Sequence, residues 1–203
     1  MSLSSGRIRT AVGSASSSHG QAAALELFRQ VECRWRYDRR ILELEKTTKD
    51  FAILAPVPEE YLIDGELMCA KVGKVAYGSR AWEVFREVDR LRHGAPVDIW
   101  IYASHRPTGA APILAASWRA TYVGHVQAQG GAHPDGMLYR PPSTMKYPRD
   151  NNGYFAVFWE VASLIRLPTS ERLKFSRLRG FGKKSHYGRI FVPEGPLIIE
   201  CPV

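Results

Sequence analysis

The stretch VDIWIYA at residues 97–103 marks the point where the apolar pattern of the chain changes from helical to extended. Its residue types are typical of strands, and strict alternation places the two isoleucines on one face and Trp100 and Tyr102 on the other. Before it, the apolar residues of 81–91 recur at helical spacing, and Gly94 ends that helix. Because mostly extended segments follow, the stretch predicts an α+β protein.

The chain after this stretch predicts a set of strands. Residues 111–126, APILAASWRATYVGHV, indicate one long or bent strand or two strands, and residues 154–167, YFAVFWEVASLIRL, give the strongest strand signal. Residues 127–152 between them form a loop rich in glycine, proline and asparagine, of a length that is often functional. The chain closes with three short predicted elements: a helix from Thr169 and strands at 191–192 and 197–200.

The chain before the stretch predicts a strand, a hairpin and a helix entry. FAILA at 51–55 is an apolar run closed by prolines and indicates a buried strand. The segment 61–74 carries an Asp64-Gly65 turn signal between apolar runs, which predicts a hairpin. Ser79 is positioned to cap the helix that follows it. Consecutive strands without helices between them favour an antiparallel sheet or a small barrel.

The two ends of the chain differ from the middle in composition. Residues 1–20 are rich in serine, glycine and alanine and predict a mobile tail. An apolar stripe over 21–46 predicts an N-terminal helix, so 21–203 is expected to be one domain with a helical extension. A hydrophobic fraction of 45% is enough for a real core.

The cysteines and the apolar runs bear on the compartment. Three cysteines, none close to another in sequence, predict reduced thiols in an intracellular, cytoplasmic protein and show no metal-ligand spacing. No apolar run is long enough for a membrane span, and the first residues lack the apolar stretch of a secretory signal. We therefore expect no metal and no cofactor.

Charge is concentrated in the segment ERLKFSRLRGFGKKSHYGR at residues 171–189, which is called the basic segment below. Seven lysines and arginines stand against one glutamate, which is a net +6, whereas the whole chain carries +8. Aromatic residues are interleaved with the cations, and this composition suits phosphate neutralisation and base stacking. The segment predicts a DNA or RNA partner whose backbone is bound by the cations Lys174, Arg177, Arg179, Lys183, Lys184 and Arg189.

Two other functions stay open from the residues alone. The first is an enzyme acting on nucleotides or RNA, with His105, His125 or His186 as a base, although the six histidines show no metal spacing. The second is an interaction protein whose basic segment binds an acidic protein. The oligomeric state is not indicated by any pattern.

Aromatic residues at strand positions suggest a pocket. Trp100, Tyr102 and Trp159 lie on predicted strands, and Ser104 and His105 follow one strand end. Aromatic and polar groups that meet at strand ends can form a cage for a nucleobase. The alternative is that most of these aromatic residues belong to the core, because tryptophan and tyrosine are mostly packing residues.

The order of short motifs resembles the EVE domains of the PUA-like superfamily. YGSRAW at 77–82, a helix, RHGAPVD at 92–98, IWIYAS at 99–104 and YVGHV at 122–126 follow the family's order over about residues 50–168. The resemblance implies a PUA-like mixed or antiparallel pseudo-barrel with flanking helices that binds RNA or a modified DNA base. It places Tyr77, Gly78, Ser79, Arg80, Tyr102 and Ser104 in the base pocket, and the strand-end argument adds His105 and Trp159.

Overall fold

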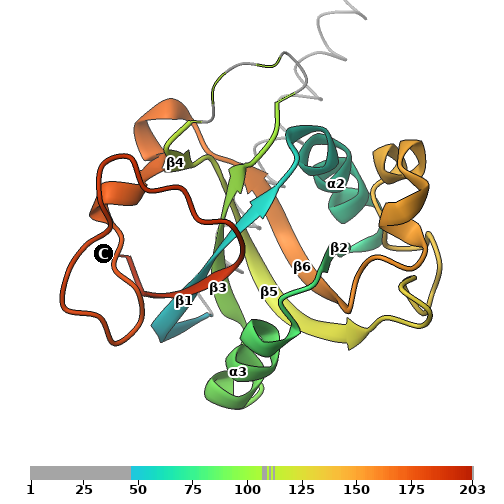
Figure 1. The fold of residues 1–203 in the computed structure, drawn as a ribbon, viewed down its shortest axis with the longest axis horizontal. Coiled ribbons are helices and arrows are strands. Elements are labelled where there is room, and N and C mark those ends of the chain that lie inside the picture. Colours follow the sequence, from blue (N-terminus) through green and yellow to red (C-terminus); the bar gives the residue numbers. More distant parts are fainter. Residues whose placement is uncertain (1–46, 107–108, 110, 112, 203) are drawn as a thin grey trace, which may run out of the picture. The chain divides into compact units, whose positions relative to one another are not determined.

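The computed structural model describes residues 47–106, 109, 111 and 113–202, and it is an α+β structure, as the sequence predicts (Figure 1). The predicted tail and N-terminal helix lie outside the described residues. Two α-helices, α2 and α3, span Glu59–Val72 and Trp82–Arg92. The strands are β1 Thr48–Val57, β2 Val75–Ser79, β3 Val97–Ala103, β4 Ala115–Ala116, β5 Trp118–Gln127, β6 Val157–Arg166, β7 Leu173–Lys174 and β8 Leu197–Glu200. Four 3-10 helices complete the structure: η1 Pro142–Lys146, η2 Pro148–Asn151, η3 Thr169–Glu171 and η4 Phe175–Arg177.

Six strands form one mixed sheet in the order β2-β6-β5-β3-β1-β8, and β4 pairs with β7 in a separate two-stranded sheet. β1 and β3 run parallel because α2, β2 and α3 carry the chain between them, and the other pairs in the sheet are antiparallel. β2 and β8 are the two edges, and the described strands do not join them. The expectation of a closed small barrel is therefore wrong, and the sheet is open.

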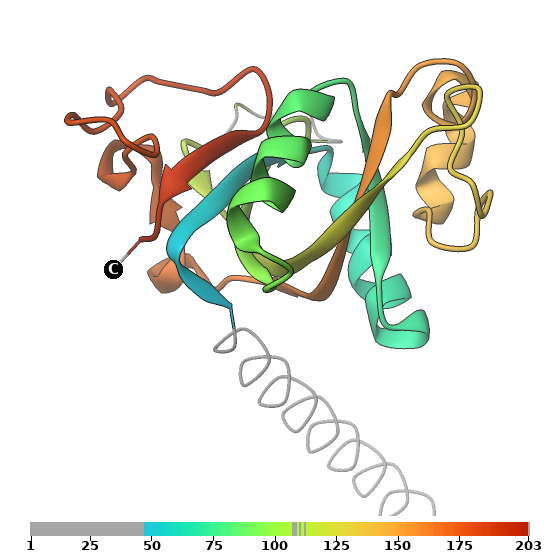
Figure 2. The same ribbon diagram turned by 90° about the horizontal axis from the view of Figure 1, so that it is seen from below.

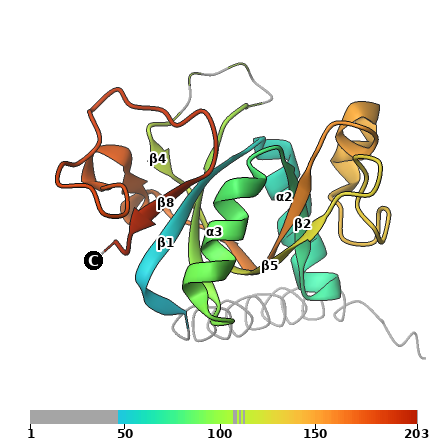
Figure 3. The same ribbon diagram turned by 60° about the horizontal axis from the view of Figure 1, so that its bottom comes forward.

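The main core lies on one face of this sheet. Alternate residues of β1, β3, β5 and β6 point into it, among them Ile53, Ile99 and Trp159. Both α-helices contribute to the same core, since α2 packs on β6 and β2 and α3 contacts β5 and β8. Figures 2 and 3 show α3 lying against this face. The alternation predicted for residues 97–103 is confirmed, because the two isoleucines of β3 enter this core.

A second, smaller core lies on the opposite face and joins the sheet to the basic segment. Ala52, Leu54 and Tyr102 are buried there against Phe175 and Leu178. The FAILA run is therefore apolar on both faces because each face of β1 is covered. Both longer segments contain the predicted strands, since 111–126 includes β4 and all but the last residue of β5, and β6 lies within 154–167.

The hairpin predicted for 61–74 is wrong, since this segment is most of α2. Gly65 lies inside the helix, and a Cβ there would come within 2.1 Å of the Tyr77 hydroxyl oxygen. The glycine is thus required by the close approach of Tyr77 and not by a turn. Buried positions Tyr61, Leu62, Gly65 and Cys69 mark the stripe that faces the core.

Three smaller expectations differ from the structure. Residues 191–192 form no strand, whereas 197–200 form β8 as predicted. The helix from Thr169 is a single 3-10 turn without a side-chain cap. Ser79 ends β2 and lies outside the helix, but its Oγ still accepts a hydrogen bond from the backbone N–H of Ala81 at 3.1 Å.

The loop 127–152 contains η1 and η2 and packs against the open edge of β2. The N–H of Ala76 donates to the carbonyl oxygen of Tyr139 at 2.8 Å, and Arg140 donates to the carbonyl oxygen of Ala76 at 2.7 Å. The loop thereby hydrogen-bonds to backbone groups that an edge strand leaves unpaired. Figure 1 shows this region beside α2, on the side of the sheet away from the basic segment.

Candidate nucleic-acid interface

Five of the seven cations of the basic segment are exposed, and Arg172 and Arg179 are half-buried. Arg179 is half-buried and forms an ion pair with Glu200 at 3.5 Å. Among the residues that the structure describes, no acid forms an ion pair with any of the other five predicted cations. These five exposed side chains belong to Lys174, Arg177, Lys183, Lys184 and Arg189. Their charges are therefore available to an external partner.

The backbone of the segment is fixed to the sheet in spite of its exposed cations. The Phe181 N–H donates to the carbonyl oxygen of Ile198 at 3.0 Å, and the Glu200 N–H donates to that of Arg179 at 2.9 Å. The Phe181 ring meets Phe51 edge to face with centroids 5.7 Å apart. Phe175 anchors the segment in the second core against Tyr102, at 5.0 Å between centroids. The backbone that carries the cations therefore needs little ordering on binding.

A hollow of about 250 Å³ lies where the end of β1 faces β2. One wall is the chain 194–196, which directly precedes β8 and follows the basic segment. Its size suits one ring-sized group, since pockets for drug-sized ligands start at about 300 Å³. The hollow is lined by Ala55, Pro56, Gly78, Ser79, Arg80, Ala81, Tyr154, Phe155, Trp159, Glu194, Gly195 and Pro196.

Tyr154 is the exposed aromatic ring of this hollow. It is 41% exposed and has two guanidinium groups near it, those of Arg80 at 5.7 Å and Arg149 at 5.5 Å from the ring centroid. Phe155 follows it and meets it edge to face at 5.0 Å. An exposed ring flanked by two cations can stack on a base while the cations approach phosphates.

Four of the predicted pocket residues come together in the hollow: Gly78, Ser79, Arg80 and Trp159. Trp159 is only 2% exposed and stacks on Phe85 at 5.7 Å, so it contributes an edge of the wall and no free face. Tyr77 is buried behind the hollow, where burial raises the pKa of its hydroxyl well above the usual value. Its hydroxyl donates to the Tyr61 carbonyl oxygen at 3.3 Å.

The other three predicted pocket residues do not line the hollow. Tyr102 points to the opposite face, where burial raises its pKa to about 12 and its hydroxyl donates to the carbonyl oxygen of Pro193. Ser104 and His105 are exposed at the end of β3. The placement of Tyr102, Ser104 and His105 in the pocket is therefore not supported, because the alternation of β3 turns Tyr102 toward the second core.

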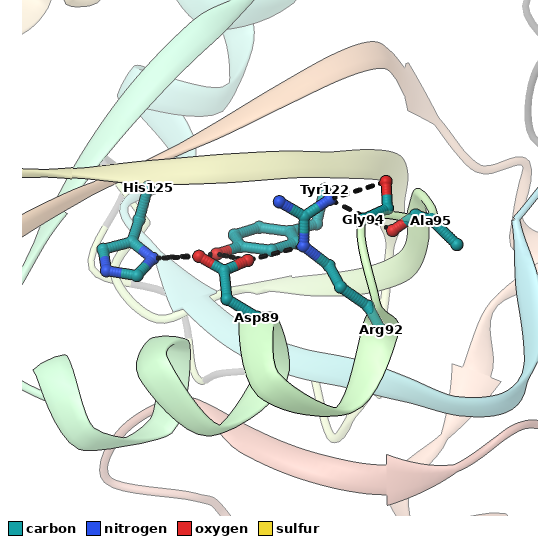
Figure 4. A network of polar contacts seen from close by, with 6 residues as sticks. All are labelled: Asp89, Arg92, Gly94, Ala95, Tyr122 and His125. Carbon is teal, nitrogen blue, oxygen red and sulfur yellow. Dashed lines mark hydrogen bonds and ion pairs between the residues drawn. The ribbon is translucent and has the colours of Figure 1, made fainter.

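One of the three candidate histidines has an acidic partner. His125 Nδ1 lies 2.7 Å from Asp89 Oδ2, while Arg92 and the Tyr122 hydroxyl contact Asp89 Oδ1 at 2.5 and 3.1 Å. Figure 4 shows that Asp89 and Arg92 come from α3 and that Tyr122 and His125 come from β5. Although burial opposes ionisation of Asp89, hydrogen bonds from His125 and Arg92 outweigh it and lower the pKa of the carboxyl.

This network fastens α3 to the sheet. None of its residues lines the hollow, and the carboxylate is shared by three donors from two elements. His105 and His186 are exposed. No group of three metal-ligating side chains occurs among the described residues. Over the same part of the chain, no helix is both long and apolar enough to cross a bilayer.

Sequence reasoning missed Tyr154, Phe155 and the chain 194–196 as site residues. Tyr154 and Phe155 were assigned to a strand, but β6 begins two residues later, at Val157. Their position directly after Asn152-Gly153 is a signal that the loop continues through them. No local pattern marks 194–196, because this chain becomes a wall of the hollow only through the pairing of β8 with β1.

Comparisons with known proteins do not assign the chain to a family: no family model matches it, and no curated protein or solved structure matches it significantly.

Proposed function

We propose that this protein is a nucleic-acid-binding module in which the basic segment binds the phosphate backbone and the hollow beside Tyr154 receives one extruded base. One observation carries the proposal: a single stretch of chain supplies five exposed cations that form no ion pair with any described acid, and then one wall of the hollow. The basic segment and the ring-sized recess are thus adjacent in the chain, and both contact β1.

The chemistry of the hollow supports this reading. Tyr154 offers a ring for stacking, and Ser79 and Glu194 add polar groups that can read the edge of a base. Arg80 lies beside the ring and extends the positive charge to the mouth of the hollow. The proposal includes the resemblance of residues 50–168 to EVE domains. It also includes the modified base that this resemblance implies as the ligand.

The test is equilibrium binding of the full chain to single-stranded and duplex DNA and RNA at low salt, followed by fluorescence anisotropy. The proposal requires binding that weakens steeply as salt is added. Absence of binding to every polynucleotide at low salt would refute it. Competition with an acidic peptide of equal charge separates this function from binding to an acidic protein. If the natural partner is an acidic protein, the peptide should displace the labelled ligand at a lower concentration than unlabelled polynucleotide does. If the partner is a nucleic acid, the unlabelled polynucleotide should be the stronger competitor.

A further inference from the structure

A second cavity, of about 240 Å³, adjoins the hollow on the other side of Phe155. Pro56, Gly78 and Phe155 border both spaces. A Cβ on Gly78 would come within 2.1 Å of the Phe155 ring, so this ring fits only against a glycine. The remaining lining residues are Val57, Pro58, Tyr61, Tyr77, Arg140 and Asp150.

Arg140 brings a buried positive charge to this cavity. The residue is 2% exposed, and its guanidinium donates to Asn151 Oδ1 at 3.2 Å, to the Ala76 carbonyl oxygen at 2.7 Å and to the Asp150 carbonyl oxygen at 3.1 Å. All three acceptors are uncharged, and no described acid forms an ion pair with it. Burial lowers the pKa of Arg140 to about 10, which leaves it protonated at neutral pH. Burying a charge without an ion-pair partner costs free energy, so Arg140 marks this cavity as a candidate binding site.

Asp150 supplies the opposite charge to the same cavity. Its Oδ2 accepts a hydrogen bond from the Tyr61 hydroxyl at 2.6 Å. Burial, together with this carboxylate, raises the pKa of Tyr61, so the hydroxyl remains a donor. The positive charge of Arg140 interacts electrostatically with Asp150, and both residues line the cavity. The cavity thus holds a cation and a carboxylate that are near each other without touching.

The arrangement of these two charges selects a class of ligand. An anion would be attracted by Arg140 and repelled by Asp150, and a cation would meet the reverse. A neutral group that accepts from the guanidinium and donates to the carboxylate satisfies both, and each such charge-assisted hydrogen bond is a strong one. The rings of Tyr77 and Phe155 provide apolar walls for a planar molecule.

We infer that this cavity recognises the lactam edge of a nucleobase, in which a ring carbonyl accepts from Arg140 and the adjacent ring N–H donates to Asp150. Guanine, hypoxanthine and uracil carry this edge, whereas adenine and cytosine do not. The inference rests on the proposed function for the class of ligand, and it places a second nucleobase in this cavity, apart from the base that the hollow receives.

Free nucleosides test the inference separately from polynucleotide binding. Calorimetric titration of the full chain with guanosine, inosine, uridine, adenosine and cytidine should show binding of the first three that is about tenfold or more tighter than that of the last two. Asp150→Asn keeps the size of the side chain but replaces an acceptor by an amide, and it should abolish the preference. Lys71→Gln, an exposed change on α2, is the control and should leave the preference intact.

Arg140→Gln removes the positive charge and tests the other half of the charged pair. If this variant does not fold, the nucleoside preference of Asp150→Asn decides whether the inference holds. Absence of nucleoside binding, equal affinity for all five nucleosides, or an Asp150→Asn protein with unchanged preference would overturn the inference and assign Arg140 only the role of holding the loop on β2. Polynucleotide binding without nucleoside preference would refute the inference and leave the proposed function standing. Nucleoside binding with the lactam preference but without polynucleotide binding would refute the proposed function and leave the inference standing.

Discussion

Replacing Lys183 and Lys184 together by glutamine should reduce the salt dependence of nucleic-acid binding. If binding uses only the five exposed cations of the basic segment, five phosphates are neutralised. Each phosphate contributes about −0.9 to the slope of log K against log salt for duplex DNA, so the slope from these cations is about −4.5 and falls to about −2.7 in the variant. A rise from about 50 to about 200 mM salt would then weaken the unchanged protein roughly 500-fold and the variant roughly 40-fold.

The assay is fluorescence anisotropy of a labelled duplex over this salt range. A matched control replaces Lys71 and Lys146 by glutamine, which removes the same charge from α2 and η1, elements that Figure 1 shows on the opposite side of the sheet. The control should keep the original slope. If the Lys183 and Lys184 variant keeps the original slope, or if the control loses as much, the basic segment is not the backbone-binding surface.

Three further predictions concern the supports of the site. Gly65→Ala should destabilise the fold by about 1–3 kcal/mol in chemical denaturation, because the new Cβ overlaps the Tyr77 hydroxyl, whereas Gly188→Ala meets no atom within 4 Å and should be close to neutral. Phe175→Ala should cost about 3–5 kcal/mol by the same measurement and weaken polynucleotide binding, since Phe175 anchors the basic segment; loss of stability with full binding would contradict that role. Because the pKa of Asp89 is lowered on folding, its contribution to stability is present above the unfolded-state pKa of about 4 and is lost as pH falls through the folded-state pKa. Asp89→Asn should therefore flatten the decline of the free energy of unfolding in acid. An unchanged acid profile would contradict the contacts drawn in Figure 4.

Strands that are buried on both faces consist mostly of apolar residues, so these strands could be predicted from the sequence. β3 matches the stretch 97–103 residue for residue, and β6 lies within 154–167. The helix α2 was missed because Asp64-Gly65 is a turn signal when read locally. Only the approach of Tyr77, which comes later in the chain, explains a glycine in the middle of that helix.

The candidate site was predictable only in the part that is local in sequence. The motif at 77–82 identified Gly78, Ser79 and Arg80, and the charge count identified the basic segment. Glu194 and Arg140 were not identified, because each reaches its cavity through pairing with a distant segment. Tyr102 lies in the second core and not in the hollow, since alternation separates two faces but does not say which one carries the site.

The central claim is that the basic segment and the hollow form one nucleic-acid site. Photo-crosslinking of the full chain to a bound polynucleotide, with the attached residues mapped by mass spectrometry, tests it most directly. We predict that, at one fixed ratio of protein to nucleic acid, crosslinks form both within 171–196 and at Tyr154 or Phe155. Attachment confined to α2 and the loop 127–152, or to the basic segment with the hollow untouched, would contradict the claim.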